Sequence, residues 1–87
     1  MGKKEPTHKI KLGRIRAAIW ANTAKDGDVW FNVEPYRIYK NGDKWEDTAS
    51  FRRDDLPIVR LAIDMAYDWI WRQEVALEES SKHDASQ

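Results

Sequence analysis

The stretch that follows Pro57 is the feature that most constrains the fold of this chain. It runs to about Glu79 without glycine or proline, and its apolar residues recur at the three- and four-residue spacings of an amphipathic helix. Asp54 and Asp55 precede it and can accept hydrogen bonds from the free N–H groups of the first turn. Pro57 fits in that turn because no N–H partner is lost there. The sequence therefore predicts one long helix that begins at about Asp54.

Before this helix, apolar and polar residues alternate, which is the periodicity of β-strands. Residues 9–22 are predicted as one strand that is interrupted at Gly13. On either side of this glycine the apolar positions have opposite parity, and one extra residue produces such a shift. A bend or bulge at Gly13–Arg14 is therefore expected, and the sheet has four strands if the bend divides the first one.

Two further strands are predicted, over residues 29–40 and 44–51. The dipeptide Asn41-Gly42 lies between them and favours a tight hairpin, because both residues tolerate positive φ. Pro35 lacks a donor for the ladder, so it predicts an edge or a bulge and a second shift of parity. The predicted fold class is therefore α+β, a twisted antiparallel sheet of three to four strands followed by one long C-terminal helix.

The length of 87 residues is sufficient for one small domain, predicted over residues 9–79 with disordered tails at 1–8 and 80–87. The absence of cysteine excludes disulfides and thiolate zinc sites, and it fits a reducing compartment. No apolar run resembles a signal peptide or approaches the roughly 20 residues of a membrane span. A cytoplasmic protein without metal or cofactor is expected, and oligomerisation is its remaining route to extra stability.

Charge is divided unevenly along the chain although the net charge is zero. Residues 1–53 carry 12 Lys/Arg and 7 Asp/Glu, a balance of 12 − 7 = +5. Residues 54–87 carry 3 Lys/Arg and 8 Asp/Glu, a balance of 3 − 8 = −5. The basic half indicates an anionic partner. Charge pairing between the two halves, within one chain or between subunits, is the alternative, and the sequence leaves both interpretations open.

Basic and aromatic side chains are interleaved along the predicted strands and form the candidate binding site. On the sheet face opposite the helix, cations would contact the phosphates of a single nucleic-acid strand while flat rings stack on its bases. In the alternative interpretation the tryptophans are cross-strand partners that stiffen an exposed face, with arginines packed over them. The predicted nucleic-acid-binding residues are Arg14, Arg16, Trp20, Trp30, Arg37, Tyr39 and Lys44.

Residues with catalytic chemistry are few, and an enzyme is not expected. The two histidines, His8 and His83, lie in the predicted tails, whereas a general base or a metal ligand must be held in place. The carboxylates of Asp54 and Asp55 are explained by helix capping. No glycine-rich phosphate loop or zinc-binding spacing is present. The sequence therefore favours a binding protein.

The predicted helix has more apolar surface than one small sheet can cover. Residues at i, i+4, i+7 and i+11 spacing form one apolar face that is predicted to pack on the sheet. They are Val59, Ile63, Ala66, Ile70 and Leu77. A second apolar face predicts a homodimer in which another helix packs there, and a curved sheet that covers both faces is the alternative. The predicted dimer-interface residues are Ile58, Leu61, Met65 and Trp69.

Three segments, Gly13 to Asn22, Arg37 to Trp45 and Ser50 to Pro57, resemble a group of small uncharacterised bacterial proteins. This likeness covers roughly residues 9–71 and implies no particular activity. The layout of strands followed by one helix also resembles the single-strand-binding domain of the transcriptional coactivator positive cofactor four and its whirly-type relatives. That resemblance implies a curved sheet that binds single-stranded DNA or RNA and C-terminal helices that help to form a dimer. Because it concerns architecture alone, it assigns no role to any residue.

Together these features predict a homodimeric module that binds single-stranded DNA or RNA and is connected with transcription. The alternative is a protein-interaction or assembly module without nucleic-acid binding, which the zero net charge, the acidic helix and its second apolar face favour.

Overall fold

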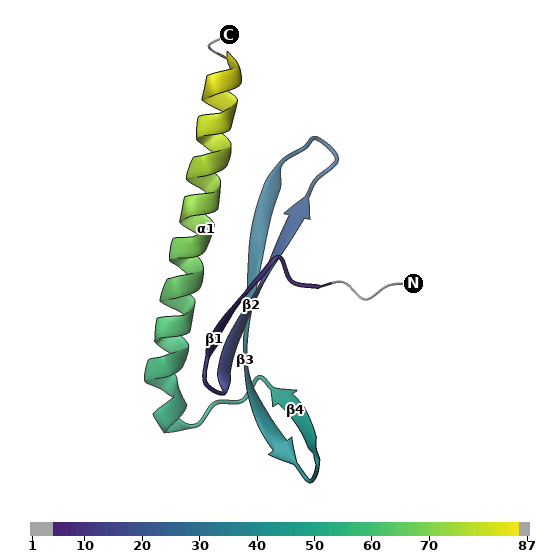
Figure 1. Cartoon of the computed structure of the whole chain (residues 1–87), viewed down its shortest axis with the longest axis vertical. Helices are drawn as coiled ribbons and strands as arrows, with labels where there is room; N and C mark the ends of the chain where they lie inside the picture. Colours follow the sequence, from purple (N-terminus) through teal and green to yellow (C-terminus); the bar gives the residue numbers. More distant parts are fainter. Residues whose placement is uncertain (1–4, 86–87) are drawn as a thin grey trace.

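A computed structural model of the chain describes residues 5–85, and the side chains of residues 5–79. The strands are β1 (His8–Leu12), β2 (Ile15–Thr23), β3 (Val29–Asn41) and β4 (Lys44–Thr48). The helices are the short 3-10 helix η1 (Arg53–Asp55) and the long helix α1 (Leu56–Ala85). The predicted α+β fold is thus confirmed, with four strands followed by one C-terminal helix (Figure 1).

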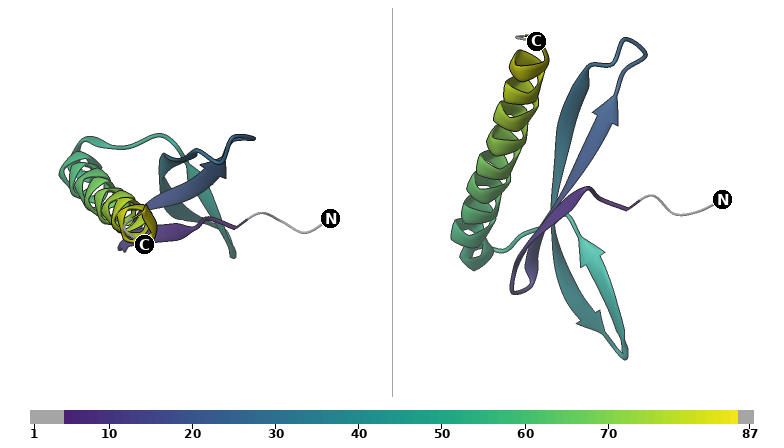
Figure 2. Two further views of the ribbon diagram at one scale, coloured as in Figure 1. Left: turned by 90° about the horizontal axis from the view of Figure 1, so that it is seen from above. Right: turned by 45° about the horizontal axis from the view of Figure 1, so that its top comes forward.

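The four strands form one antiparallel sheet in the order β1-β2-β3-β4, so each strand pairs with the next one along the chain. Helix α1 packs on one face of this sheet, against β1, β2 and β3. Figure 2 shows the helix on that side alone, and among the described residues no element covers the opposite face. We call this uncovered side, which carries Arg16, Ala18, Trp20 and their cross-strand neighbours, the outer face.

A two-residue turn at Gly13–Arg14 divides the first predicted strand into β1 and β2. Leu12 pairs with Ile15 across the turn, and Gly13 has a φ of 64°, which glycine adopts readily because it has no Cβ. The predicted change of parity is therefore real, but its cause is a hairpin and not a bend or bulge within one strand. Gly42, with a φ of 66°, lies in the predicted hairpin between β3 and β4.

Pro35 lies within β3 without changing the register. Ala17 pairs with Pro35, and the pairing continues unbroken to Arg37, so the predicted second shift of parity is wrong. The amide of Ile38 donates to the carbonyl oxygen of Arg14, on the β2 side, at 2.9 Å. Because the amides of successive strand residues point to opposite sides, the amides of the odd-numbered residues of β3 point toward β4. Because β4 pairs with β3 only from Arg37 onward, the N–H that Pro35 lacks would have no partner there.

The core lies between the sheet and α1 and is built from small and branched side chains. The buried residues of this cluster are Ile10, Ile15, Ala17, Ile19, Val59, Ala62 and Ala66. Of the residues that the sequence predicts to face the sheet, Val59 and Ala66 are buried, whereas Ile63 is 45% exposed. The helix instead turns its small residues Ala62 and Ala66 toward the sheet, which lets the two backbones approach closely and leaves Ile63 on the flank.

Helix α1 is longer than the sequence predicts, because it continues past Glu79 to Ala85. Its 30 residues correspond to a length of about 45 Å. Toward its C-terminal end the sheet and the helix diverge (Figure 1), and Leu77, which was predicted to pack on the sheet, is 52% exposed there. The side chain of His83 and residues 86–87 of the predicted tail lie outside the described residues.

Strand β1 begins at His8, within the segment predicted as an N-terminal tail. The amide of Thr7 donates to the Ile19 carbonyl oxygen at 2.8 Å, so the pairing with β2 starts even earlier. The His8 ring stacks on Trp69 with 4.6 Å between ring centroids. His8 is thus part of the packed structure, and residues 1–4 of the predicted tail lie outside the described residues.

Candidate nucleic-acid interface

Cross-strand pairing determines which side chains share the outer face, since directly paired residues point to the same side of a sheet. Four rows of paired residues cross it. They are Lys11–Arg16–Tyr36, Lys9–Ala18–Glu34, Trp20–Asn32 and Asn22–Trp30. These rows combine three cations and three aromatic rings with a single carboxylate.

Ala18 forms the floor of this surface. It is only 5% exposed although no described element packs on the outer face. The long side chains of the neighbouring rows must therefore lie over it, close to the sheet. Lys9, Arg16 and Trp20 are the basic and aromatic neighbours of Ala18, and Trp30, at one end of the four rows, is 47% exposed.

Two of these side chains are held by hydrogen bonds. The indole Nε1 of Trp20 donates to Oε1 of Glu34 at 2.8 Å, which fixes the ring across β2 and β3. The Nε of Arg16 donates to the Gly13 carbonyl oxygen at 2.9 Å, which leaves the remaining guanidinium donors for a ligand. Groups that are already ordered lose less conformational entropy when a ligand binds. Glu34 has the opposite effect on an anionic ligand, because its charge repels phosphate.

The basic and aromatic surface continues toward the β3–β4 hairpin. Arg14, in the turn between β1 and β2, has its guanidinium 5.5 Å from the ring centroid of Trp45. Trp45 pairs with Lys40 and is 55% exposed. By register, Lys40 and Trp45 are on the same side of the sheet as Tyr36, so this cation–π contact extends the outer face to β4.

Three of the seven predicted binding residues, Arg16, Trp20 and Trp30, share the outer face by register. Arg14 adjoins it through Trp45. Five residues of this surface are not among the binding residues predicted from the sequence. They are Lys9, Lys11, Tyr36, Lys40 and Trp45. The inward parity of Ile10 and Leu12 was the signal that could have placed the two β1 lysines on the outer face.

The other three predicted residues, Arg37, Tyr39 and Lys44, lie on the opposite face, the side on which α1 packs. Arg37 pairs with the core residue Ile15. Lys44 pairs with Asn41, which is on the same face as Arg37 and Tyr39 because the three are alternate residues of β3. The hypothesis that all seven residues share one face is therefore wrong. The error comes from the parity shift predicted at Pro35, which does not occur because β4 does not extend along β3 as far as this proline.

Arg37 and Tyr39 instead belong to a second basic site near the start of α1. It is an open groove of about 480 Å³, which we call the β3–β4 groove. The residues that line it are Arg14, Arg37, Tyr39, Lys40, Thr48 and Arg52.

Trp69 was predicted to lie at a dimer interface but packs within the chain. Its ring is stacked on His8 and meets Phe31 edge-on at 5.8 Å between centroids. With Met65 it also lines a cavity of about 430 Å³ between β1 and α1. The other three predicted interface residues, Ile58, Leu61 and Met65, are 41%, 51% and 40% exposed.

Among residues 5–85, no group of three or more His, Cys, Asp or Glu side chains is placed to hold a metal ion. None of the helices in the described part of the chain has the length and apolar character needed to cross a membrane. No protein-family model, curated protein sequence or solved structure matches the chain. The resemblances noted from the sequence therefore stay predictions.

Proposed function

We propose that this protein binds single-stranded DNA or RNA on the outer face of its sheet. The observation that carries the proposal is the layer of three cations and three aromatic rings on a face that no described element covers. Lysine and arginine side chains contact phosphates, while tryptophan and tyrosine rings stack on unpaired bases. None of the three outer-face cations forms an ion pair with a described residue, so their charges are available to a ligand.

The proposed recognition has little dependence on base sequence. Stacking accepts every base, and phosphate contacts carry no direct sequence information. A duplex hides its bases in the stack, so the rings of the outer face favour a single strand. We expect this binding activity in a cytoplasmic protein with a connection to transcription, as the sequence predicts. The activity requires no catalytic group.

The proposed site is tested by fluorescence anisotropy with a labelled single-stranded oligonucleotide and the matching duplex. Trp30→Ala removes a ring that is 47% exposed on the outer face. Since stacking contributes about 1–3 kcal/mol per base, the affinity for the single strand should fall roughly 5- to 150-fold. Trp71→Ala is the matched control, because Trp71 is 56% exposed but lies on α1. Absence of binding at low salt, or equal losses in the two variants, would contradict the proposal.

We also propose that the protein is a homodimer in which α1 packs against its counterpart. The proposal is supported by the exposed apolar side chains on one flank of the helix, Ile58, Leu61 and Met65. This flank is continuous with the largely apolar cavity beside β1, so a second copy could bury both together. Burial of a large apolar side chain contributes about 1.5–3 kcal/mol, which is substantial for a small domain without disulfides. If the chain proves monomeric, this flank favours the alternative of a protein-interaction module.

A further inference from the structure

We propose that the β3–β4 groove is a separate anion site that binds a phosphate group carrying about two negative charges. The group is a phosphate monoester or an equivalent free anion, and not a base or a single phosphodiester. The groove lies beside β4 and draws on both faces of the sheet, because Arg37 and Tyr39 are on the side of α1 while Lys40 is on the outer face by register. Its chemistry does not depend on the aromatic rings of the proposed nucleic-acid site. Only the source of the phosphate, a strand end or a free nucleotide, rests on the proposed function.

The groove concentrates positive charge. Arg14, Arg37, Lys40 and Arg52 line it, and no carboxylate does. Among the described residues the only ion pair of these four cations joins Arg37 to Asp55, so the four cations and this carboxylate sum to 4 − 1 = +3. Four cations around one opening repel each other, and a multivalent anion relieves that repulsion.

Arg37 is positioned before any ligand arrives. Its Nε is 3.3 Å from Oδ2 of Asp55 and donates to the Ser50 carbonyl oxygen at 3.4 Å. The Arg37 and Asp55 side chains are only 18% and 23% exposed, so water screens this pair incompletely. Because both contacts use Nε, the terminal nitrogens of the guanidinium are left to face the groove. A guanidinium with this geometry suits a phosphate, since its paired donors match two oxygens.

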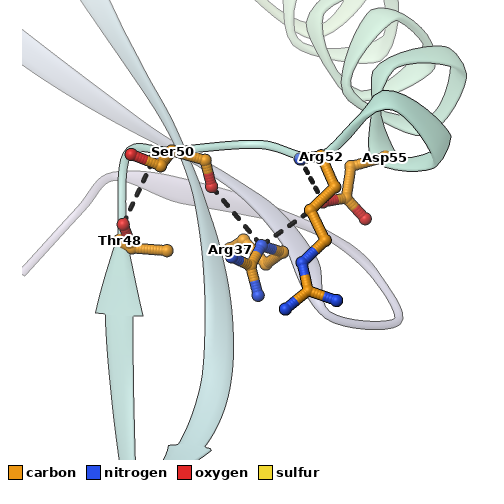
Figure 3. A network of polar contacts seen from close by, with 5 residues as sticks. All are labelled: Arg37, Thr48, Ser50, Arg52 and Asp55. Atoms are coloured by element: carbon orange, nitrogen blue, oxygen red, sulfur yellow. Dashed lines mark hydrogen bonds and ion pairs between the residues drawn. The ribbon is translucent and has the colours of Figure 1, made fainter.

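The same carboxylate also fixes Arg52. Oδ2 of Asp55 accepts a hydrogen bond from the backbone amide of Arg52 at 2.8 Å, so one oxygen holds both the Arg37 side chain and the Arg52 backbone (Figure 3). In this view the guanidinium groups of Arg37 and Arg52 both extend from the network, and only Nε of Arg37 is engaged. The Thr48 hydroxyl accepts the Ser50 amide at 3.1 Å and retains its own proton as a further donor.

The groove offers more charge than aromatic surface. Tyr39 is the one aromatic residue that lines it, and the guanidinium of Arg37 lies 5.9 Å from its ring centroid in a cation–π contact that covers one side of the ring. A base therefore has less aromatic surface to stack on here than on the outer face. A phosphate monoester carries about −1.5 to −2 at neutral pH, which fits the local excess of charge better than the single charge of a phosphodiester.

Arg14 connects the two sites. It lines the groove and also lies over Trp45 at the hairpin end of the outer face. A strand bound on the outer face could thus pass this residue and place its terminal phosphate in the groove. A free nucleotide or pyrophosphate would use the same arginines without touching the outer face.

The test begins with isothermal titration of the full chain with inorganic phosphate and with pyrophosphate at low salt. Arg52→Gln removes one exposed groove cation but keeps the backbone hydrogen bond to Asp55. Arg53→Gln is the matched control, because Arg53 is adjacent, pairs with Asp54 and has a 92% exposed side chain that does not line the groove. We expect Arg52→Gln to weaken pyrophosphate binding about tenfold, the loss of one charge-assisted contact, and Arg53→Gln to change it less than twofold. Equal effects, or no saturable binding up to about 10 mM, would overturn the groove site.

The source of the phosphate is determined with one oligonucleotide in two forms, with a 5′-phosphate and with a 5′-hydroxyl end. If a strand end enters the groove, the phosphorylated form binds more tightly and Arg52→Gln abolishes the difference. If a free anion is the ligand, pyrophosphate binds while the two oligonucleotides bind equally or not at all. Failure of the proposed function can be told apart from failure of the groove site. In that case Trp30→Ala does not change oligonucleotide affinity, while pyrophosphate binding persists.

Discussion

The three cations in the four paired rows of the outer face make the salt dependence of nucleic-acid binding there a quantity that the structure predicts. Lys9, Lys11 and Arg16 occupy adjacent rows. For single strands the logarithm of the affinity falls with the logarithm of salt with a slope of about −0.7 per phosphate contact, so three contacts give about −2.1. Between 50 and 200 mM salt, a fourfold change, the affinity should decrease roughly 18-fold.

The double variant Lys9→Gln/Lys11→Gln removes two of these charges and keeps the length of the side chains. Both lysines are exposed on the edge strand β1, so the change in folding stability should stay within about 0.5 kcal/mol. One contact remains, the slope becomes about −0.7, and the same change of salt reduces the affinity only about 2.6-fold. Anisotropy titrations at four salt concentrations with a 5′-hydroxyl oligonucleotide measure both slopes.

The control for this experiment is Lys44→Gln/Arg60→Gln, which also removes two cations. Lys44 lies on the opposite face of the sheet by register, and Arg60 lies on α1. The slope of this variant should stay near −2.1. If the control variant flattens the slope as much as the lysine variant does, or if neither changes it, the phosphates are not contacted on the outer face and the reasoning fails.

Three further outcomes follow from individual contacts. Glu34→Gln keeps an acceptor for Trp20 but removes one of the two carboxylates, with Asp47, that register places on the outer face, so oligonucleotide affinity should rise about 2- to 5-fold in the same anisotropy assay. Ile19→Ala empties a fully buried position and should lower the free energy of unfolding by about 2–5 kcal/mol, measured by urea denaturation, and a loss below about 1 kcal/mol would contradict the assigned core. Leu61→Glu should convert a dimer to a folded monomer in sedimentation velocity at micromolar concentration, and a wild-type chain that already sediments as a monomer would refute the dimer.

The fold could be predicted to a large extent because its signals are local. Alternation, the turn dipeptide Asn41-Gly42 and the capped start of the helix each depend on neighbouring residues. The register at Pro35 could not be predicted from neighbouring residues. A proline does not disturb the ladder where its strand has a hydrogen-bonded neighbour on one side only, and whether β4 extends as far as Pro35 depends on the tertiary fold. The rotation of α1 could not be predicted for a related reason. The periodicity of large apolar residues gives no weight to Ala62, whose small size lets the helix approach the sheet.

The candidate site was only partly predictable from the sequence. Reading β1 and β2 as one strand hid the fact that Lys11 and Arg16 are cross-strand neighbours. Recognising a hairpin at Gly13–Arg14 would have placed them in one row. The β3–β4 groove could not be foreseen, since it combines Arg14 from one turn with Arg37 from a central strand and Arg52 from the loop before η1. Such a cluster depends on the tertiary fold and leaves no pattern at any fixed spacing.

The uneven distribution of charge along the sequence can now be interpreted more closely. Pairing between the basic and the acidic half was one explanation for it, yet only three ion pairs occur among the described residues. Two are local, Arg53 with Asp54 and Arg72 with Asp68, and Arg37 with Asp55 alone joins distant segments. Most cations of the basic half therefore have no ion-pair partner among the described residues, and seven of them lie on the outer face or in the groove while the acidic residues of α1 lie elsewhere. Because separated surfaces of opposite sign cannot neutralise each other beyond a Debye length of about 8 Å, the basic surfaces keep their attraction for an external polyanion at physiological salt.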